Sequence, residues 1–390
     1  MNSVEIKERD QNHILGTYAR NDLCIVKGKG ATCYSPEGKK YIDFSSGIGV
    51  NSLGFSDDGW VKAITEQVQK IQHISNLFYT EPCGELAEVL VKRTGYPKVF
   101  FANSGAEANE GAIKTARKYS FLKYGKGRHE IITLVNSFHG RTLATITATG
   151  QDHYHQYFDP FVEGFLYANA NDIEDMKSKI SEKTCAVMIE LVQGEGGVNT
   201  LDQEYVRELS QLCKEKDILL IVDEVQTGIG RTGKLFAFEH FGIQPDVVTM
   251  AKGLGSGLPI GGILFHSSCA DVLKPGDHGT TFGGNPVVCA GGLEILSRLD
   301  ENFLQAVTEK GEFMKAEILK MEGVSEVTGL GMMIGIMPSG KDAKAVVNRC
   351  LDLGLMALTA KDKIRLLPPL TITIEEIKEG LEKLKQALIG

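Results

Sequence analysis

A lysine in the second half of the chain combines several features of a reactive amine. Lys252 follows the apolar run 246–251 and precedes the glycine-rich stretch 253–257. A lysine at the end of a buried strand, beside glycines that leave space, can have a lowered pKa and act as a nucleophile, although most lysines are solvated surface residues. A dinucleotide-binding fingerprint needs a helix directly after its glycines, and the pattern of 259–265 predicts an extended segment instead. We therefore take Lys252 as the candidate catalytic residue.

A carboxylate follows the most apolar run of the chain. Asp223 comes directly after 218–222, whose sequence is ILLIV. Such a residue can cap a turn, or bind a metal as a Walker-B acid does, but the chain has no GxxxxGK[ST] motif to accompany it. A third use is to hold a heteroaromatic nitrogen, because the negative charge keeps a pyridinium protonated and strengthens it as an electron sink.

Two further polar segments follow apolar runs. Ser104, Gly105 and Ala106 open a helix, where an N-cap, a flexible turn and free N–H groups form a phosphate cradle or simply a well-capped helix. In the stretch SFHGRT, Phe138 is expected either to stack on a planar cofactor or to fill the core. Arg141 has a planar guanidinium, which binds carboxylates through two parallel hydrogen bonds. A phosphate cradle, a ring-nitrogen acid, a stacking aromatic and a lysine on successive strand ends together describe a site for pyridoxal phosphate (PLP).

The elements that must position these residues alternate along the middle of the chain. Apolar strands are predicted at 98–102, 130–135, 185–192, 217–222 and 246–251. Helices are predicted at about 106–123 and 202–216, and Val61, Ile64, Val68 and Ile71 recur at helical spacing. Continuous apolar strands between helices indicate an α/β fold whose mostly parallel sheet is covered by helices. Ligands of such sheets bind beyond the carboxyl ends of the strands.

We predict a large PLP-binding domain at 56–288 and a smaller α+β domain at 289–390. The segment 1–55, with short strands around Tyr34 and Tyr41, is predicted to pack with the small domain. A capping box that begins at Thr373 precedes a final helix whose apolar face includes Ile377, Leu381 and Leu384.

Composition narrows the function classes. The chain has 390 residues and a net charge of −8, with no basic stripe, which argues against nucleic acid binding. It opens without the apolar core of a signal peptide, and no stretch reaches the ~18 apolar residues of a membrane span. The eight dispersed cysteines are expected to be buried reduced thiols of a cytoplasmic protein. His153 and His155 lack the neighbours of a metal site, so no metal is expected.

Longer motifs resemble a known family over nearly the whole chain. The matched stretches are NSGAEANEGAIK, SFHGRT, QGEGG, VDEVQTGIGRTG, PDVVTMAKGLGSGLPIGG and TTFGGNP. The chain resembles the class III (subgroup II) PLP-dependent aminotransferases, and within them the acetylornithine aminotransferases through GIGVNSLG, SFHGRT and RLLPPL. The resemblance implies PLP fold type I and a homodimer with shared active sites.

The resemblance also implies roles for individual residues. Lys252 carries the cofactor as a Schiff base, Asp223 pairs with its ring nitrogen, and Gln226 lies near its ring hydroxyl. The remaining cofactor-binding residues are Ser104, Gly105, Ala106, Phe138 and, from the other subunit, Thr281. The implied substrate-binding residues are Arg141, Thr280 and the pair of Glu195 and Arg365, which adjusts the pocket to two substrates.

The implied reaction transfers an ω-amino group to 2-oxoglutarate, with N2-acetylornithine as the expected donor in arginine biosynthesis. Ornithine, 4-aminobutyrate and succinylornithine remain alternative donors. A PLP aminomutase or racemase would keep Lys252 and Asp223 without consuming 2-oxoglutarate. A binding protein without PLP, built on the same sheet, is the remaining alternative.

Overall fold

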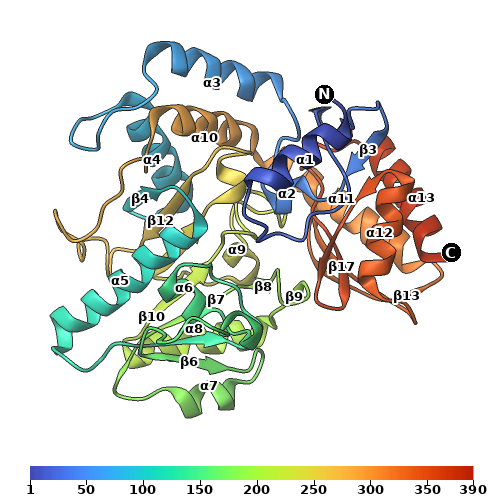
Figure 1. Cartoon of the computed structure of the whole chain (residues 1–390). Helices are drawn as coiled ribbons and strands as arrows, with labels where there is room; N and C mark the ends of the chain where they lie inside the picture. The colour runs from blue at the N-terminus through green and yellow to red at the C-terminus, as the bar shows by residue number, and fades with distance from the viewer. Residues whose placement is uncertain (390) are drawn as a thin grey trace.

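A seven-stranded sheet forms the centre of the molecule in the computed structural model, which describes residues 1–389 (Figure 1). The strand order is β4-β12-β11-β10-β7-β5-β6, and β12 alone runs antiparallel to its neighbours. The strands are β4 (Lys98–Ala102), β5 (Glu130–Leu134), β6 (Phe165–Ala168), β7 (Thr184–Ile189), β10 (Leu219–Asp223), β11 (Val247–Met250) and β12 (Gly261–Phe265). The predicted, mostly parallel α/β sheet is confirmed.

The two faces of this sheet bury alternate residues of each strand. In β10, Leu219 and Ile221 pack with Ala112 of helix α5 (Gly105–Tyr124), whereas Leu220 and Val222 lie in the core that α8 (Gln203–Lys216) helps to form. Side chains alternate across a strand, so a strand covered on both faces must be apolar throughout. This is the reason why β7 and β10 are buried at every position.

Two smaller sheets lie outside the central one. Strands β13 (Val324–Leu330), β14 (Met333–Pro338), β17 (Lys363–Leu366) and β16 (Leu358–Ala360) form an antiparallel sheet, which α11 (Glu301–Leu319) and α12 (Ala343–Leu353) contact. The first strands, β1 (Lys27–Lys29), β2 (Thr32–Tyr34) and β3 (Lys40–Asp43), pair with β15 (Leu355–Met356). The chain beginning therefore shares a sheet with the C-terminal part, while the domain boundaries themselves stay a prediction.

The helices begin close to the positions that the sequence predicts. Helices α3 (Asp58–Lys70) and α4 (Glu81–Thr94) contact α10 (Pro286–Arg298), which begins at Pro286 because Asn285 caps it. The final helix α13 (Ile374–Ile389) carries the predicted capping box, in which Thr373 and Glu376 hydrogen-bond reciprocally. Its inward face includes the predicted leucines.

Three findings bear on the composition-based expectations. Within residues 1–389, no helix is long and apolar enough to cross a membrane. The same residues contain no group of three or more His, Cys, Asp or Glu side chains placed to bind a metal ion. All eight cysteines are free, and seven of them are buried.

Candidate active site

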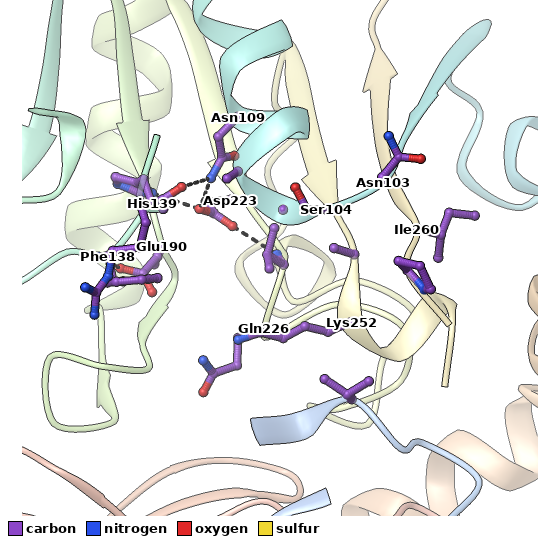
Figure 2. A pocket seen from close by; sticks show the side chains of 18 of the residues that line it. Asn103, Ser104, Asn109, Phe138, His139, Glu190, Asp223, Gln226, Lys252 and Ile260 are labelled. Carbon is purple, nitrogen blue, oxygen red and sulfur yellow. Dashed lines mark hydrogen bonds and ion pairs between the residues drawn. The ribbon is translucent and has the colours of Figure 1, made fainter. Parts of the chain in front are cut away.

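A cavity of about 470 Å³ lies at the carboxyl ends of the central strands (Figure 2). Its wall brings together segments that are far apart in the sequence. The lining residues include Val50, Ser104, Gly105, Ala106, Asn109, Phe138, His139, Arg141, Glu190, Asp223, Val225, Gln226, Lys252 and Ile260. Seven predicted cofactor residues and Arg141 therefore meet in one place, where parallel sheets bind ligands.

Lys252 reaches this cavity from a turn rather than from a strand. The prediction that it ends the strand is wrong, because β11 ends at Met250 and Lys252 opens a 3-10 turn, Lys252–Leu254. Its φ of 41° lies in the left-handed region, which is strained for a side chain other than glycine and recurs at functional sites. Burial lowers the pKa of Lys252 to about 8, and the positive charge of Arg365 acts in the same direction. The amine is therefore partly neutral near physiological pH and available as a nucleophile.

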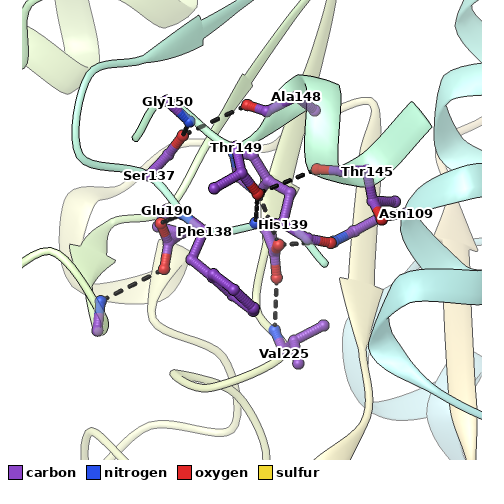
Figure 3. A network of polar contacts seen from close by, with 12 residues as sticks. Asn109, Ser137, Phe138, His139, Thr145, Ala148, Thr149, Gly150, Glu190 and Val225 are labelled. Carbon is purple, nitrogen blue, oxygen red and sulfur yellow. Dashed lines mark hydrogen bonds and ion pairs between the residues drawn. The ribbon is translucent and has the colours of Figure 1, made fainter. Parts of the chain in front are cut away.

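Three neighbours hold the carboxylate of Asp223, which Figure 2 labels, and Figure 3 shows these neighbours, Asn109, His139 and Val225. Its Oδ2 accepts from Asn109 Nδ2 at 2.8 Å and lies 2.8 Å from His139 Nδ1, and its Oδ1 accepts from the Val225 N–H at 3.0 Å. Asn109 Nδ2 also donates to the His139 carbonyl at 2.7 Å. Asp223 is only 4% exposed, so these hydrogen bonds stabilise a carboxylate that burial would otherwise disfavour.

The start of α5 forms a polar rim of the cavity. Ser104 caps the helix by accepting from the Glu107 N–H, and the first N–H groups of a helix have no partner inside it. A Cβ atom on Gly105 would come 2.7 Å from Val225 Cγ1, so no larger residue fits at this close approach. Such a helix start can hold a phosphate, because its first N–H groups lack partners and lie at the positive end of the helix dipole, so the phosphate site stays a prediction.

The aromatic ring of Phe138 lines the cavity and packs against Tyr154. The rings of Phe138 and Tyr154 lie 5.6 Å apart at 66°, and the Arg141 guanidinium lies 4.1 Å from the Tyr154 ring centroid. Glu190 is buried behind Phe138 and accepts its N–H at 2.9 Å. Burial raises the pKa of Glu190 to about 7, and the charge of Asp223 acts in the same direction.

Glu195 and Arg365 form an ion pair beside Gln226. Arg365 Nη1 donates to Glu195 Oε1 at 2.6 Å and to Gln226 Oε1 at 3.2 Å. The Arg365 side chain is 3% exposed and that of Glu195 is 25% exposed. Burial opposes ionisation of Glu195, but the charge and hydrogen bond of Arg365 keep the pKa of Glu195 below its usual value. Arg365 Nε is buried without a hydrogen-bond partner in residues 1–389, so this guanidinium has spare donor capacity.

Two predicted site residues lie elsewhere. Thr280 and Thr281 line a separate cavity of about 330 Å³ together with Glu107 and His278. Thr280 Oγ1 accepts from Asn103 Nδ2 at 2.8 Å, and Asn103 lines both cavities. A single chain therefore does not bring either threonine to Lys252.

Several residues that line the cavity were not predicted, and three of them contact other site residues. Asn109 lies inside the helix that Ser104 caps, and nothing in its local pattern separates it from other polar helix residues. Glu190 stands at the carboxyl end of an apolar run, which is the signal that identified Asp223 and that applied here as well. Val225 belongs to the stretch DEVQ and contributes its backbone N–H, for which an apolar side chain among polar neighbours gives no signal.

Comparisons with known proteins agree with this geometry. The family model described as Aminotransferase class-III matches residues 17–388. The acetylornithine aminotransferase of Haemophilus ducreyi is 51% identical over 390 residues, which cover 100% of this chain and 99% of that protein. The acetylornithine aminotransferase of Caldanaerobacter subterraneus is 46% identical over 385 residues, covering 97% and 98%.

Solved structures share the fold over the full length. The ornithine aminotransferase from Toxoplasma gondii superposes with a TM-score of 0.95 at 29% identity, covering 100% of this chain and 95% of that one. The acetylornithine aminotransferase from Elizabethkingia anophelis has a TM-score of 0.88 at 32% identity, covering 100% and 99%. A family match across almost all residues, together with a lysine and a carboxylate facing one cavity at the sheet edge, shows that this chain belongs to the class-III aminotransferases.

Proposed function

We propose that this chain transfers the ω-amino group of N2-acetylornithine to 2-oxoglutarate, giving N-acetylglutamate 5-semialdehyde and glutamate. The observation that carries the choice of donor is the 51% identity, over the full length, to a relative named acetylornithine aminotransferase. Further relatives at 41% to 46% identity bear the same name. The reaction class rests on the family match.

The cofactor is pyridoxal phosphate, and the residues at the cavity fit it. A Toxoplasma ornithine aminotransferase with the same fold is described with PLP at its active site. Here Asp223 would hold the ring nitrogen, since its buried carboxylate faces the cavity with fixed donors behind it. The N–H groups of Gly105 and Ala106 would hold the phosphate, Phe138 would stack on the ring, and Gln226 would lie near the ring hydroxyl. When bound, the cofactor supplies the electron sink for transamination.

The residues of the chain itself would transfer a proton during the reaction. Lys252 is the candidate general base, because its Nζ is a largely desolvated amine whose pKa of about 8 lies close to the working pH. Asn109 and the Val225 N–H donate to the Asp223 carboxylate, and His139 Nδ1 lies 2.8 Å from it, so the carboxylate is fixed where the ring nitrogen would lie. Asp223 is only 4% exposed, which limits the access of water to this end of the cavity.

Two arginines are assigned to substrate carboxylates. Arg141 has no acidic partner within residues 1–389, so its guanidinium would bind the carboxylate that lies far from the reacting carbon in both substrates. Arg365 would bind the carboxylate next to the reacting carbon of glutamate, which acetylornithine lacks at that carbon. Glu195 would mask Arg365 by the observed ion pair in one half-reaction and release it in the other.

The proposed assembly is a cytoplasmic homodimer with active sites at the subunit boundary. Support comes from Leu77, Phe78, Tyr79 and Phe282, which are between 59% and 106% exposed. His73 stacks against Phe282 at 5.3 Å, and Asn76 donates to the carbonyl of Thr280, so these segments form one exposed surface. A second copy on this surface would bring Thr281 to the phosphate and Thr280 to the substrate of its partner.

The test is a donor panel with 2-oxoglutarate as acceptor. Acetylornithine should exceed ornithine, 4-aminobutyrate and succinylornithine in kcat/KM, measured from glutamate formation. Lys252→Ala should lose turnover and the absorbance band of the lysine-bound cofactor, whereas the control Lys62→Ala changes an exposed helix residue and should leave both unchanged. A clear preference for another donor would replace acetylornithine, and product formation without glutamate would indicate an aminomutase.

A further inference from the structure

The 3-10 turn Asp152–Tyr154 places one aromatic ring directly against Arg141. We infer that Tyr154 is a positioning residue that holds the Arg141 guanidinium in place for the distal carboxylate of both substrates. The Arg141 Cζ atom lies 4.1 Å from the Tyr154 ring centroid and 5.6 Å from that of Phe138. The two rings meet edge to face at 66°, so they form a corner around the guanidinium. This inference rests on the proposed function, in which Arg141 binds a substrate carboxylate.

Nothing else in the chain fixes the orientation of Arg141. It is exposed, and within residues 1–389 its side chain makes no ion pair and no hydrogen bond. A free arginine side chain loses considerable rotamer entropy when it binds a ligand. Stacking on a ring contacts the flat face of the guanidinium and leaves its N–H edge free. Tyr154 therefore reduces the entropy loss without occupying the donors that a carboxylate needs.

The turn that carries Tyr154 is tied to the segment that carries Arg141. Gln151 Nε2 donates to the Ser137 carbonyl at 2.9 Å, and the Gly150 N–H donates to Ser137 Oγ at 3.0 Å. The Tyr154 N–H donates to the Gln151 carbonyl at 3.0 Å, so the hydrogen bonds that begin at Ser137 extend to the backbone of Tyr154. The ring of the neighbouring His153 also lies against it, with centroids 3.8 Å apart. The turn that carries Tyr154 and the segment that carries Arg141 are consequently held together by hydrogen bonds.

The hydroxyl group of Tyr154 makes no hydrogen bond within residues 1–389, so the ring alone contacts Arg141. Two substitutions can therefore distinguish the role of the ring from that of the hydroxyl group. Tyr154→Phe keeps the stacking face and should keep kcat/KM within about twofold of wild type. Tyr154→Leu keeps an apolar side chain but loses the π face, which is worth about tenfold for a partly desolvated cation–π contact.

The first test compares two donors in the holoenzyme. N-acetyl-1,4-diaminobutane is N2-acetylornithine without its carboxylate, so it cannot use Arg141 in the proposed way. Tyr154→Leu should lower kcat/KM about tenfold for acetylornithine, mainly through KM, and less than about twofold for the analogue. Tyr154→Phe should restore the wild-type ratio of the two donors. Thermal unfolding and the absorbance of the bound cofactor identify any variant that has lost its fold.

The second test does not depend on the donor. 2-Oxoglutarate and pyruvate are both 2-oxo acids, but only the first has a distal carboxylate. Tyr154→Leu should weaken the half-reaction of the aminated enzyme with 2-oxoglutarate about tenfold and leave that with pyruvate nearly unchanged. In an Arg141→Gln background, the same substitution should add little to the loss.

The outcomes separate this inference from the choice of donor. A wild-type enzyme that does not use acetylornithine would contradict the proposed donor. The comparison of 2-oxoglutarate with pyruvate would still test the role of Tyr154. Equal losses for both acceptors, or equal impairment of Tyr154→Phe and Tyr154→Leu, would overturn the positioning role. A folded Tyr154→Leu variant with wild-type KM values would overturn it as well.

Discussion

Lys252 is surrounded by charges of both signs, and their balance decides its chemistry. Burial and the nearby Arg365 disfavour the ammonium form, while the carboxylates of Glu195, Asp223 and Glu190 favour it. Burial and the charge of Arg365 outweigh the carboxylates, so the pKa of Lys252 falls to about 8. An ordinary lysine, with a pKa near 10.4, would be almost fully protonated at neutral pH and would make a poor nucleophile.

The first prediction concerns the pH dependence of cofactor uptake. Only the neutral amine of Lys252 attacks the aldehyde of PLP, so the rate of attachment in the cofactor-free chain should increase with pH and level off above a midpoint near 8. Stopped-flow absorbance over pH 6 to 10 measures it. A midpoint above pH 10 would contradict the lowered pKa, and Arg365→Ala should move the midpoint upward because it removes a positive charge.

The second prediction concerns Glu195 and Arg365. Removing one partner of a largely buried ion pair costs on the order of 3–5 kcal/mol, so losses of about 100-fold or more are expected. Arg365→Ala should impair the half-reaction with glutamate or 2-oxoglutarate far more than that with acetylornithine. Glu195→Ala should do the reverse, because Arg365 stays unmasked.

Single-turnover measurements of each half-reaction decide between these outcomes. The control is Glu208→Ala, which removes an exposed ion pair with Lys177 and should change neither half-reaction. Equal losses in both half-reactions for both site variants would rule out the masking role.

At the scale of elements, the start of α5 and the segment after β10 must approach closely. The Val225 N–H supports Asp223, and the Val225 side chain packs against the space in which Gly105 lacks a Cβ. The phosphate cradle and the ring-nitrogen acid are therefore positioned by one contact between a helix start and a strand end. The small residues Ala108 and Ala112 continue this close packing of α5 on the sheet.

The third prediction tests that contact. Gly105→Ala would place a Cβ 2.7 Å from Val225 Cγ1, and overpacking of this kind displaces neighbouring backbone. PLP affinity should fall about tenfold with little change in the fold. In a Val225→Ala background the same substitution should cost much less, because both clashing methyl groups are absent. Equal costs in both backgrounds, measured by PLP titration, would contradict the contact.

At the scale of the whole molecule, apolar side chains remain uncovered next to the site. Besides Leu77, Phe78, Tyr79 and Phe282, Val61 and Val68 of α3 are 42% and 48% exposed, so the predicted apolar face of this helix is only partly buried within the chain. Large exposed apolar surfaces are typical of protein interfaces. Thr280 and Thr281 lie on the segment that includes Phe282, so the proposed interface would include both threonines.

The fourth prediction is that the protein sediments as a dimer of two 42.5 kDa chains. Phe78→Asp places a charge where the proposed interface would bury an apolar ring, so it should shift the protein to the monomer and reduce activity strongly. Leu122→Asp is the control, because Leu122 is 64% exposed on the last turn of α5 and should leave the dimer intact. An active wild-type monomer in analytical ultracentrifugation would contradict the assembly.

Much of the fold and part of the site follow from local sequence patterns. Short apolar runs such as 218–222, rich in β-branched residues, are typical of strands covered on both faces, so the sheet and its polar ends were predictable. Because ligands bind at the carboxyl ends of parallel strands, the same patterns led to Asp223, Lys252 and the start of α5. Longer motifs then assigned Glu195 and Arg365 through the family resemblance, which no local pattern would have done.

The tertiary structure decided which of these residues touch. Asn109 and His139 hold Asp223 across 114 and 84 positions of the sequence, and Arg365 reaches Glu195 across 170. Contacts of this kind depend on the strand order and on the packing of α5, neither of which has a local signal. The same holds for the turn that carries Lys252 beyond its strand and for the pKa of its amine, because burial and neighbouring charges exist only in the folded chain. Sequence determines which groups stand at the edge of the sheet, and the fold determines their partners, because periodicity is local whereas desolvation and electrostatics act through space.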